Sequence, residues 1–296
     1  MNHIVAIPLD STLASFVGKK GSENSITFYN RQYSGSTIVA LAPSSIEEKF
    51  YGAAEAMCIS HKILLSTSTI DRLFGEMVVA ASLLGKKVML TNDNDVTKLL
   101  AGSLNDFEIV SRESVLDRII SGAPKPQAGG TRIDIDKAFV VRGVGTVVLG
   151  VVTRGSVKVH DELFHSSGKK VVVKSIQSQD KDIQEAGYGT RVGLALKGID
   201  ADEIEKGDVI SSTLVSKARK IRAKINVANI ADAEVEKGKS YGFVSNFTYA
   251  NAVVGENGDI SIAKPVPLEI GDDFLLLRES VPRIFAKGTV TEKIED

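Results

Sequence analysis

Glycine and lysine stand together in two short segments, which are the places where a phosphate-binding loop could be sought. The first is Gly18-Lys19-Lys20 and the second is Gly238-Lys239-Ser240. Such a loop has the form G-x-x-x-x-G-K-[ST], because backbone amides surround the phosphates, the lysine neutralises them and the hydroxyl binds Mg²⁺. Leu13 and Ala233 occupy the position of the first glycine. Both segments are therefore predicted to be solvated turns.

The four histidines and the single cysteine show no spacing typical of a metal site. They are His3, Cys58, His61, His160 and His165. We also find no arrangement of Ser, His and Asp that predicts nucleophilic catalysis. We therefore expect no metal, no catalytic residues and no bound cofactor.

Composition limits the class of partner. The chain has 296 residues, enough for two or three domains, and its 36 Lys and Arg against 37 Asp and Glu leave a net charge of -1. No overall positive field predicts a DNA partner, so any RNA contact must be local. No apolar run approaches the roughly 18 residues of a membrane span, and the N-terminus lacks a secretory signal. We expect a cytoplasmic protein with no membrane partner.

The elements that must position any site change in kind along the chain. Up to residue 120, short apolar runs alternate with segments of helical spacing, which predicts a mostly parallel sheet covered by helices. Strands are predicted at 3–7, 25–29, 37–42, 62–66, 87–91 and 107–110, and helices at 44–59, 69–84, 95–104 and 113–120. Ser44 with Glu47, and Ser45 with Glu48, each fit a capping box at the start of the first helix.

The segment 121–130, SGAPKPQAGG, has the composition of a linker, and the helical pattern ends there. Apolar runs separated by glycine-rich turns then follow one another, with a break near 211–216 that predicts two small barrels in series. Strands are predicted at 138–141, 146–152, 170–176, 192–196, 222–227, 241–247, 260–265, 274–278 and 284–290. The predicted domains are an α/β domain at 1–123, a linker at 124–130, and β-barrels at 131–212 and 213–296.

Two stretches between residues 133 and 210 follow a known pattern: IDIDKAFVVRGVGTVVLGVVTRGSVKVHDEL and KSIQSQDKDIQEAGYGTRVGLALKGIDADEIEKGDVI. They resemble the second domain of translational GTPases, above all the selenocysteine-specific elongation factors, which are relatives of elongation factor Tu. Seven glycines fall at the family's turn positions, namely Gly143, Gly145, Gly150, Gly155, Gly189, Gly193 and Gly207. The resemblance implies a degenerate P-loop GTPase-like α/β domain followed by two small β-barrels of the translation-factor type.

The family's nucleotide-binding elements are altered in this chain. Leu41-Ala42-Pro43-Ser44-Ser45 stands in place of Asp-x-Pro-Gly-His, and Asn92-Asp93-Asn94-Asp95 in place of Asn-Lys-x-Asp. The vestigial positions are Pro43, Ser45, Asn92 and Asp95, of which the last two also fit a polar turn with an N-cap. Because phosphoryl transfer depends on positioning and charge stabilisation, we expect a pseudo-GTPase that is not an enzyme and binds neither GTP nor Mg²⁺.

The resemblance also implies a pocket for the aminoacyl end of a charged tRNA. Its residues fall on Asp136, Lys137, Phe139, Val141, Gln177 and Arg191. Two cations in one small pocket would favour an anionic side chain such as a selenolate. The alternative is that Asp136 and Lys137 are an ordinary solvated pair and that Arg191 forms a salt bridge at the barrel rim.

The segment KARKIRAK carries basic residues at alternating positions of a predicted strand, namely Lys217, Arg219, Lys220, Arg222 and Lys224. Such a strand presents one charged face, which suits contacts with RNA phosphates. The alternative is an edge strand whose charges prevent aggregation.

The resemblance therefore implies a translation elongation factor-like protein that binds aminoacyl-tRNA, and possibly the ribosome, without hydrolysing GTP. Two alternatives stay open, namely a protein-interaction scaffold at the ribosome and a factor with residual guanine-nucleotide binding. The sequence ends near the third barrel, so we expect it to lack the additional C-terminal domain of complete selenocysteine-insertion factors.

Overall fold

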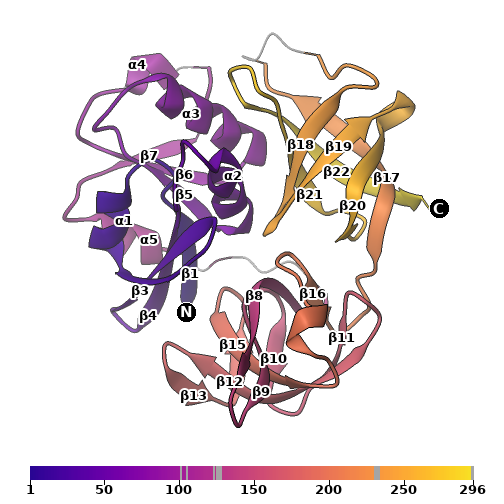
Figure 1. Ribbon diagram of the computed structural model, residues 1–296. Coiled ribbons are helices and arrows are strands. Elements are labelled where there is room, and N and C mark those ends of the chain that lie inside the picture. The colour runs from indigo at the N-terminus through magenta and orange to yellow at the C-terminus, as the bar shows by residue number, and fades with distance from the viewer. Residues whose placement is uncertain (101, 105, 123, 125–128, 230–233, 295–296) are drawn as a thin grey trace.

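The computed structural model describes residues 1–100, 102–104, 106–122, 124, 129–229 and 234–294. Most of the predicted linker, 125–128, lies outside the described residues. Three parts are arranged around a common centre: an α/β part that ends with residue 120, a first barrel below it and a second barrel beside it (Figure 1).

The α/β part is built on a seven-stranded sheet in the order β2-β3-β4-β1-β5-β6-β7. Neighbours from β4 to β7 pair in parallel, whereas β2, β3 and β4 pair antiparallel. The strands are β1 (Asn2–Ala6), β2 (Lys19–Glu23), β3 (Ile26–Tyr33), β4 (Ser36–Pro43), β5 (Lys62–Leu65), β6 (Lys87–Thr91) and β7 (Phe107–Val110). The apolar runs in β1, β4 and β5 are buried throughout, as expected of strands covered on both faces.

Among the described residues, five helices accompany this sheet, and the sequence predicted four. They are α1 (Ser11–Val17), α2 (Phe50–Ile59), α3 (Arg72–Leu84), α4 (Thr97–Leu100) and α5 (Val115–Ile120). The predicted helix 44–59 starts only at Phe50, and the side chain of its N-cap residue, Lys49, forms no capping hydrogen bond. Of the two predicted capping boxes, one contact is present, a 3.4 Å hydrogen bond from the Glu48 amide to the Ser45 hydroxyl. It stabilises a turn before the helix.

The first barrel contains nine strands and one 3₁₀ helix. They are β8 (Arg132–Val141), β9 (Gly145–Arg154), β10 (Ser156–Lys158), β11 (Glu162–His165), β12 (Lys170–Ser178), β13 (Lys181–Ile183), β14 (Glu185–Gly187), β15 (Arg191–Lys197), η1 (Ala201–Glu203) and β16 (Val209–Ser211). The sheet order is β11-β16-β8-β9-β15-β12-β13, and β11 also pairs with β12, so the sheet returns to its first strand. Gly150 and Gly193 lie within β9 and β15, so their prediction as turn glycines is wrong.

The second barrel is closed in the order β17-β20-β19-β18-β21-β22. Its elements are β17 (Lys217–Val227), β18 (Ser240–Ser245), β19 (Thr248–Val254), η2 (Glu256–Gly258), β20 (Asp259–Pro267), β21 (Asp273–Leu277) and β22 (Ile284–Ile294). The predicted fold class, α/β followed by two barrels, is confirmed. Within the described residues, no helix is long and apolar enough to cross a membrane, and no group of three or more His, Cys, Asp or Glu could hold a metal ion.

Candidate functional site

The outer face of the first barrel carries a row of four residues across four neighbouring strands. Lys137 in β8 lies opposite Leu149 in β9, Leu149 lies opposite Gly193 in β15, and Gly193 lies opposite Gln177 in β12. Side chains directly opposite one another project from the same face of a sheet. The register therefore brings together Lys137 and Gln177, two of the residues that the resemblance assigns to the aminoacyl pocket.

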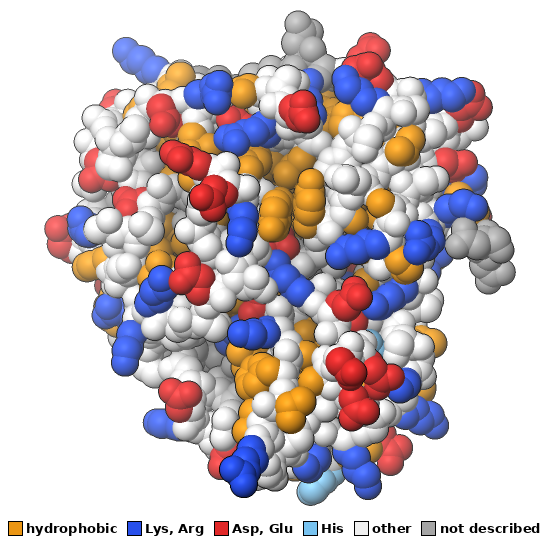
Figure 2. Space-filling model, viewed as in Figure 1, with side chains coloured by type: hydrophobic (Ala, Val, Ile, Leu, Met, Phe, Trp, Pro, Cys, Tyr) orange, Lys and Arg blue, Asp and Glu red, His pale blue; other side chains and the backbone are white. Residues whose placement is uncertain are grey.

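A second row lies beside the first and is mainly apolar. Phe139 pairs with Val147, Val147 with Ala195 and Ala195 with Ser175. The Lys137 ammonium lies 6.0 Å from the centroid of the Phe139 ring. In Figure 2, hydrophobic side chains gather on the surface of the first barrel, in the lower part of the view, and charged side chains border them. Phe139 and Lys137 therefore lie on the same face of the barrel.

Gly193 has no side chain, so the surface of this face is lower at its position. A Cβ atom added there would lie 3.4 Å from Leu149 Cδ2 and 4.0 Å from Gln177 Cβ, which are ordinary contact distances. The face therefore has room at Gly193 for a further carbon atom between Leu149 and Gln177. Lys137 at the border is exposed and forms no ion pair with any described residue, whereas Gln177 donates a 2.9 Å hydrogen bond to Asp182. We define the two rows as the open face.

Two other predicted pocket residues lie outside the open face. Arg191 binds Asp136 with 2.8 Å between Nη2 and Oδ2, donates to the Ser22 hydroxyl at 3.0 Å, and its guanidinium lies 3.6 Å from the Phe28 ring centroid. A register shift between Ile135 and Lys137 marks a bulge at Asp136. The α/β part therefore covers both residues, and one of the two cations expected in the pocket is already paired. The salt-bridge interpretation of Arg191 is the one that the geometry supports.

The remaining predicted pocket residue, Val141, pairs with Gly145 at the end of the β8–β9 hairpin, beyond both rows. The sequence prediction did not assign Val147, Leu149 and Gly193 to the pocket, although the alternation of apolar residues in 146–152 places Val147 and Leu149 on one side of a strand. The sequence does not supply the strand register that sets Gly193 between Leu149 and Gln177.

In β17, the strand predicted to contact RNA phosphates, several of the basic side chains are bound to other residues. It lies between β20 and β22, so its interpretation as an edge strand is wrong. Lys217 forms a 2.6 Å ion pair with the buried Asp208, and Arg222 binds Asp259 and Glu292 at 2.8 and 2.6 Å.

Two further cations of β17 bear on that prediction. Arg219 donates to the carbonyl of Ala263, and a register shift occurs between Ala218 and Lys220. This irregularity interrupts the predicted alternation along the strand. Lys224 is exposed and makes no ion pair in the described part of the chain.

The vestigial nucleotide-site positions have local structural partners. Asp95 Oδ1 accepts a 3.0 Å hydrogen bond from the Thr97 amide at the start of α4, Pro43 ends β4 opposite Ile26, and Ser45 accepts the contact from Glu48 described above. Asn92 lies in the turn after β6. These contacts fit the interpretation of Asn92 to Asp95 as a polar turn with an N-cap.

A Ser, His and Asp chain that the sequence did not indicate occurs in the first barrel. His165 Nδ1 lies 2.8 Å from the Ser167 hydroxyl, and its Nε2 lies 3.1 Å from Asp208 Oδ2. The Ser167 amide also donates to Nδ1 at 3.2 Å, and Asp208 also holds Lys217 and the Glu205 amide. These additional contacts tie a hairpin turn to the start of β17, so we assign the chain a structural role.

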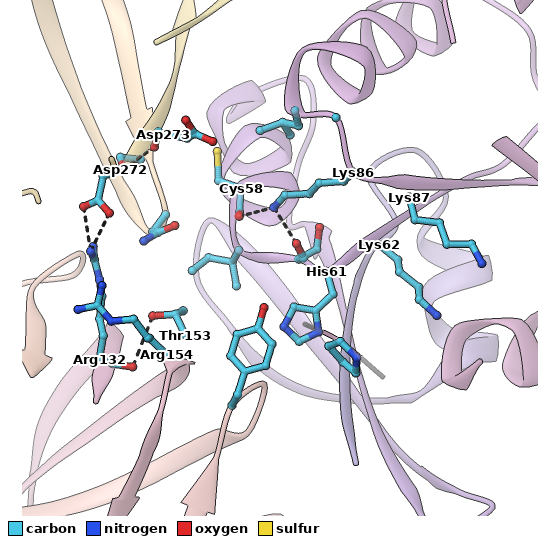
Figure 3. A pocket seen from close by; sticks show the side chains of 18 of the residues that line it. Cys58, His61, Lys62, Lys86, Lys87, Arg132, Thr153, Arg154, Asp272 and Asp273 are labelled. Atoms are coloured by element: carbon cyan, nitrogen blue, oxygen red, sulfur yellow. Dashed lines mark hydrogen bonds and ion pairs between the residues drawn. The ribbon is translucent and has the colours of Figure 1, made fainter. Parts of the chain in front are cut away.

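A cavity of about 670 Å³ lies where the three parts meet (Figure 3). Lys86 on its wall donates to the carbonyls of Met57, Cys58 and Ser60 at 2.5 to 2.8 Å, and so satisfies the C-terminal end of α2. Burial lowers the pKa of Lys86 to about 8. Figure 3 also shows Arg132 and Asp272 facing each other from the two barrels. The cavity therefore has a charged wall whose cations are engaged in structural contacts.

Comparisons with known proteins agree with this architecture. The family model for elongation factor Tu domain 2 matches residues 145–211. The uncharacterized protein MJ0325 of Methanocaldococcus jannaschii is 31% identical over 288 residues, which cover 92% of this chain and 94% of that protein. Elongation factor 1-alpha of Metallosphaera sedula is 34% identical over 127 residues, 43% of this chain and 28% of that protein.

Two solved structures share the whole fold. Translation elongation factor SelB of Methanococcus maripaludis, in complex with the GTP analogue GppNHp, matches with a TM-score of 0.80 at 20% identity, over 99% of this chain and 79% of that one. A bacterial selenocysteine-specific elongation factor, EF-Sec, matches with a TM-score of 0.80 at 17% identity, over 98% and 58%. The chain therefore belongs to the same family as the Methanocaldococcus jannaschii protein and is a relative of the translational GTPases with the fold of the selenocysteine-specific elongation factors.

Proposed function

We propose that the open face of the first barrel binds the acceptor end of an aminoacyl-tRNA and that the protein does so without hydrolysing GTP. The observation that carries this proposal is the row in which Gly193 leaves a hollow between Leu149 and Gln177, with Lys137 at its border. The protein is related to translation elongation factors, and this row lies in its elongation factor Tu domain 2 and the adjoining strand β8.

The chemistry of the face suits the end of a tRNA. Phe139, Val147 and Leu149 offer an apolar bed on which an unpaired base or an apolar side chain can rest. Lys137, which has no ion pair among the described residues, supplies one cation for a phosphate or an acidic group. Because Arg191 is held by Asp136, the face carries less positive charge than the sequence analysis expected. The proposal therefore extends to aminoacyl groups that are not anionic.

The absence of GTP hydrolysis is proposed from the altered nucleotide elements. Leu13 and Lys20 stand where a phosphate-binding loop needs a glycine and a hydroxyl, and Asp93 stands where guanine recognition uses a lysine. In addition, Asp10 accepts a 2.8 Å hydrogen bond from the Leu13 amide and caps α1 directly after β1. That amide is no longer available to a phosphate. Titration with a fluorescent GTP analogue should give no binding at micromolar concentrations, and binding would support the residual-nucleotide alternative.

Protection of the aminoacyl ester tests the tRNA proposal. A mixture of charged tRNAs should lose its amino acids more slowly in the presence of the wild-type protein. Gly193→Val fills the hollow without a close contact at Cβ and should abolish this protection. Gly187→Val is the matched control, because it adds the same side chain to the same barrel at a position with no atom within 4 Å.

Two results would overturn the proposal. If no charged tRNA is protected by the wild-type protein, the protein does not shield an acceptor end. If Gly193→Val protects as well as Gly187→Val, the ligand lies elsewhere. If the wild-type protein does protect charged tRNA, sequencing of the RNA that copurifies with it, and identification of the attached amino acid, would identify the tRNA.

A second candidate function is a protein-interaction role at the ribosome. Val140 and Val144 at the tip of the β8–β9 hairpin are 72% and 38% exposed and border a groove that also contains Lys169, Lys174 and Lys197. Exposed apolar side chains beside cations are typical of a contact surface. Cosedimentation with ribosomes that is lost in Val140→Ser but kept in Gly193→Val would favour this role over tRNA binding.

A further inference from the structure

We infer that the α/β part and the two barrels are permanently joined, and that buried charge pairs across their seams hold the arrangement without a bound nucleotide. This inference goes beyond the proposed ligand, because it concerns whether the open face and the central cavity change shape at all. Three seams are involved, and each contains a buried charged side chain whose partner belongs to a different part.

The seam between the α/β part and the first barrel centres on Glu55 of α2. Lys206, which follows η1, places its ammonium 2.6 and 2.7 Å from the two carboxylate oxygens, and Ser25 donates to one of them at 2.5 Å. Glu55 is 1% exposed. Withdrawal of the barrel would break both contacts between this carboxylate and the Lys206 ammonium.

The seam between the α/β part and the second barrel centres on Glu76 of α3, which is also 1% exposed. Arg283 donates to it from the backbone amide at 2.8 Å, from Nε at 2.9 Å and from Nη2 at 3.1 Å. The same guanidinium lies 3.6 Å from the centroid of the Phe50 ring. Three donors on one carboxylate fix both distance and orientation.

The seam between the two barrels forms one side of the central cavity (Figure 3). Arg132 of the first barrel, 5% exposed, binds Asp272 at 2.8 Å and Glu269 at 3.0 Å. Asn246 of the second barrel donates a 2.8 Å hydrogen bond back to Asp134. The second barrel therefore supplies partners for two buried charges of the first, Arg132 and Asp134.

Apolar packing crosses the seams as well. Val151 of the first barrel and Phe247, Leu277 and Ile284 of the second belong to the same buried cluster as residues of β1, α2 and α3. A shared core makes separation of the parts cost apolar burial in addition to ion pairs. Each part also has a buried core of its own, so the shared cluster and the buried charge pairs together are what hold the parts in one arrangement around the open face.

Wild-type protein provides the first test. Small-angle scattering profiles should coincide for the protein alone, with Mg²⁺ and GTP, and with Mg²⁺ and GDP, and calorimetry should show a single unfolding transition. The sequence has no Trp, so Tyr249→Trp introduces one reporter against Tyr51, whose ring lies 4.5 Å from that of Tyr249 across a seam. Its emission should change at the same temperature as the calorimetric transition.

A matched pair of variants provides the second test. Arg283→Met removes the guanidinium that pairs with Glu76, keeps the backbone hydrogen bond, and should split the transition into two. Arg222→Met is the control, because it removes two ion pairs at 2.8 and 2.6 Å that lie wholly within the second barrel. Arg222→Met should keep a single transition. Its midpoint should lie closer to that of the wild-type protein than the midpoint of the first transition of Arg283→Met does.

The inference is wrong if the wild-type protein shows two separate transitions, if a nucleotide changes its scattering profile, or if Arg283→Met keeps a single transition like Arg222→Met. The wild-type measurements need no variant, so they decide the question even where Arg283→Met fails to fold. Neither readout involves tRNA, so loss of the proposed function would leave this result unchanged.

Discussion

The guanidinium of Arg191 in the first barrel lies 3.6 Å from the centroid of the Phe28 ring in the α/β part. Phe28 is 1% exposed, and the same guanidinium binds Asp136 and Ser22. A residue that the resemblance assigns to a ligand pocket thus connects two parts of the molecule. Asp136 Oδ1 and Arg191 Nη1 nevertheless have no hydrogen-bond partner in the described structure.

Arg191→Met should destabilise the protein by about 3–5 kcal/mol, because it leaves the buried Asp136 without its cation. Chemical denaturation measures this loss. The control is Lys197→Met at the exposed end of the same strand, which should change the unfolding free energy by less than about 0.5 kcal/mol. Equal effects of the two substitutions would mean that the Arg191 pair contributes no more than a surface lysine.

The sequence predicted much of the fold, because its strongest signals are local. The strand 107–110 and the apolar cores of β1, β4, β5 and β6 follow directly from apolar runs. The prediction missed α1 and β2 because they are short or polar: α1 has seven residues, and β2 reads KKGSE and is largely exposed. Such elements are fixed by their neighbours, here by pairing with β3 and by the Asp10 cap.

The site was predicted less completely for a different reason. Lys137, Phe139 and Gln177 come together because strand register follows from the barrel, which the resemblance implied. Arg191 did not join them because its partner Phe28 lies in another part of the chain. No periodicity or spacing encodes such a distant contact, and a charged residue has the same sequence signature whether it meets a ligand or a buried aromatic ring.

Stability should fall as the pH is lowered below about 6.5, in part because of His61. Burial, reinforced by the nearby Lys86, lowers the pKa of His61 to about 3, and its ring stacks on Tyr188 of the first barrel with 4.6 Å between centroids. Between these pH values His61 is protonated in the unfolded chain but neutral in the native protein. Its contribution to the free energy of unfolding is therefore complete above pH 6.5 and is lost towards pH 3. Between pH 7 and 5 the loss is at most about 2 kcal/mol.

His61→Gln should reduce this pH dependence, measured as the difference between urea midpoints at pH 7 and pH 5. His160→Asn, at an exposed turn position, is the control and should keep the wild-type difference. The contribution of His3, whose pKa burial and Lys62 lower to about 4, remains in both variants. An unchanged difference in His61→Gln would show that this ring titrates alike in the native and unfolded states.

Lys137→Gln should weaken the binding of charged tRNA and lower the slope of log K against log salt by about 1, as expected when one phosphate contact is lost. Its ammonium has no ion pair among the described residues, so stability should be unchanged. Lys181→Gln, on an exposed strand of the same barrel, is the control. Equal salt slopes for the two variants would remove Lys137 from the proposed contact.

Lys217 and Lys224 should behave in opposite ways, although both belong to the strand that the sequence assigned to phosphate contacts. Lys217 lies 2.6 Å from Asp208, which is 2% exposed and also holds His165. Lys217→Gln should therefore cost stability, on the order of 1–3 kcal/mol for a buried charge that loses one of several partners, and should leave the salt slope unchanged.

Lys224→Gln is the matched substitution, because this side chain is exposed and unpaired in the described part of the chain. It should lower the salt slope of tRNA binding by about 1 and leave the unfolding free energy within about 0.5 kcal/mol of wild type. Denaturation and filter binding at several salt concentrations measure the two effects. If Lys217→Gln alone reduces the slope, the Asp208 pair opens on binding and the strand contacts phosphate as first predicted; if neither does, β17 lies outside any RNA contact.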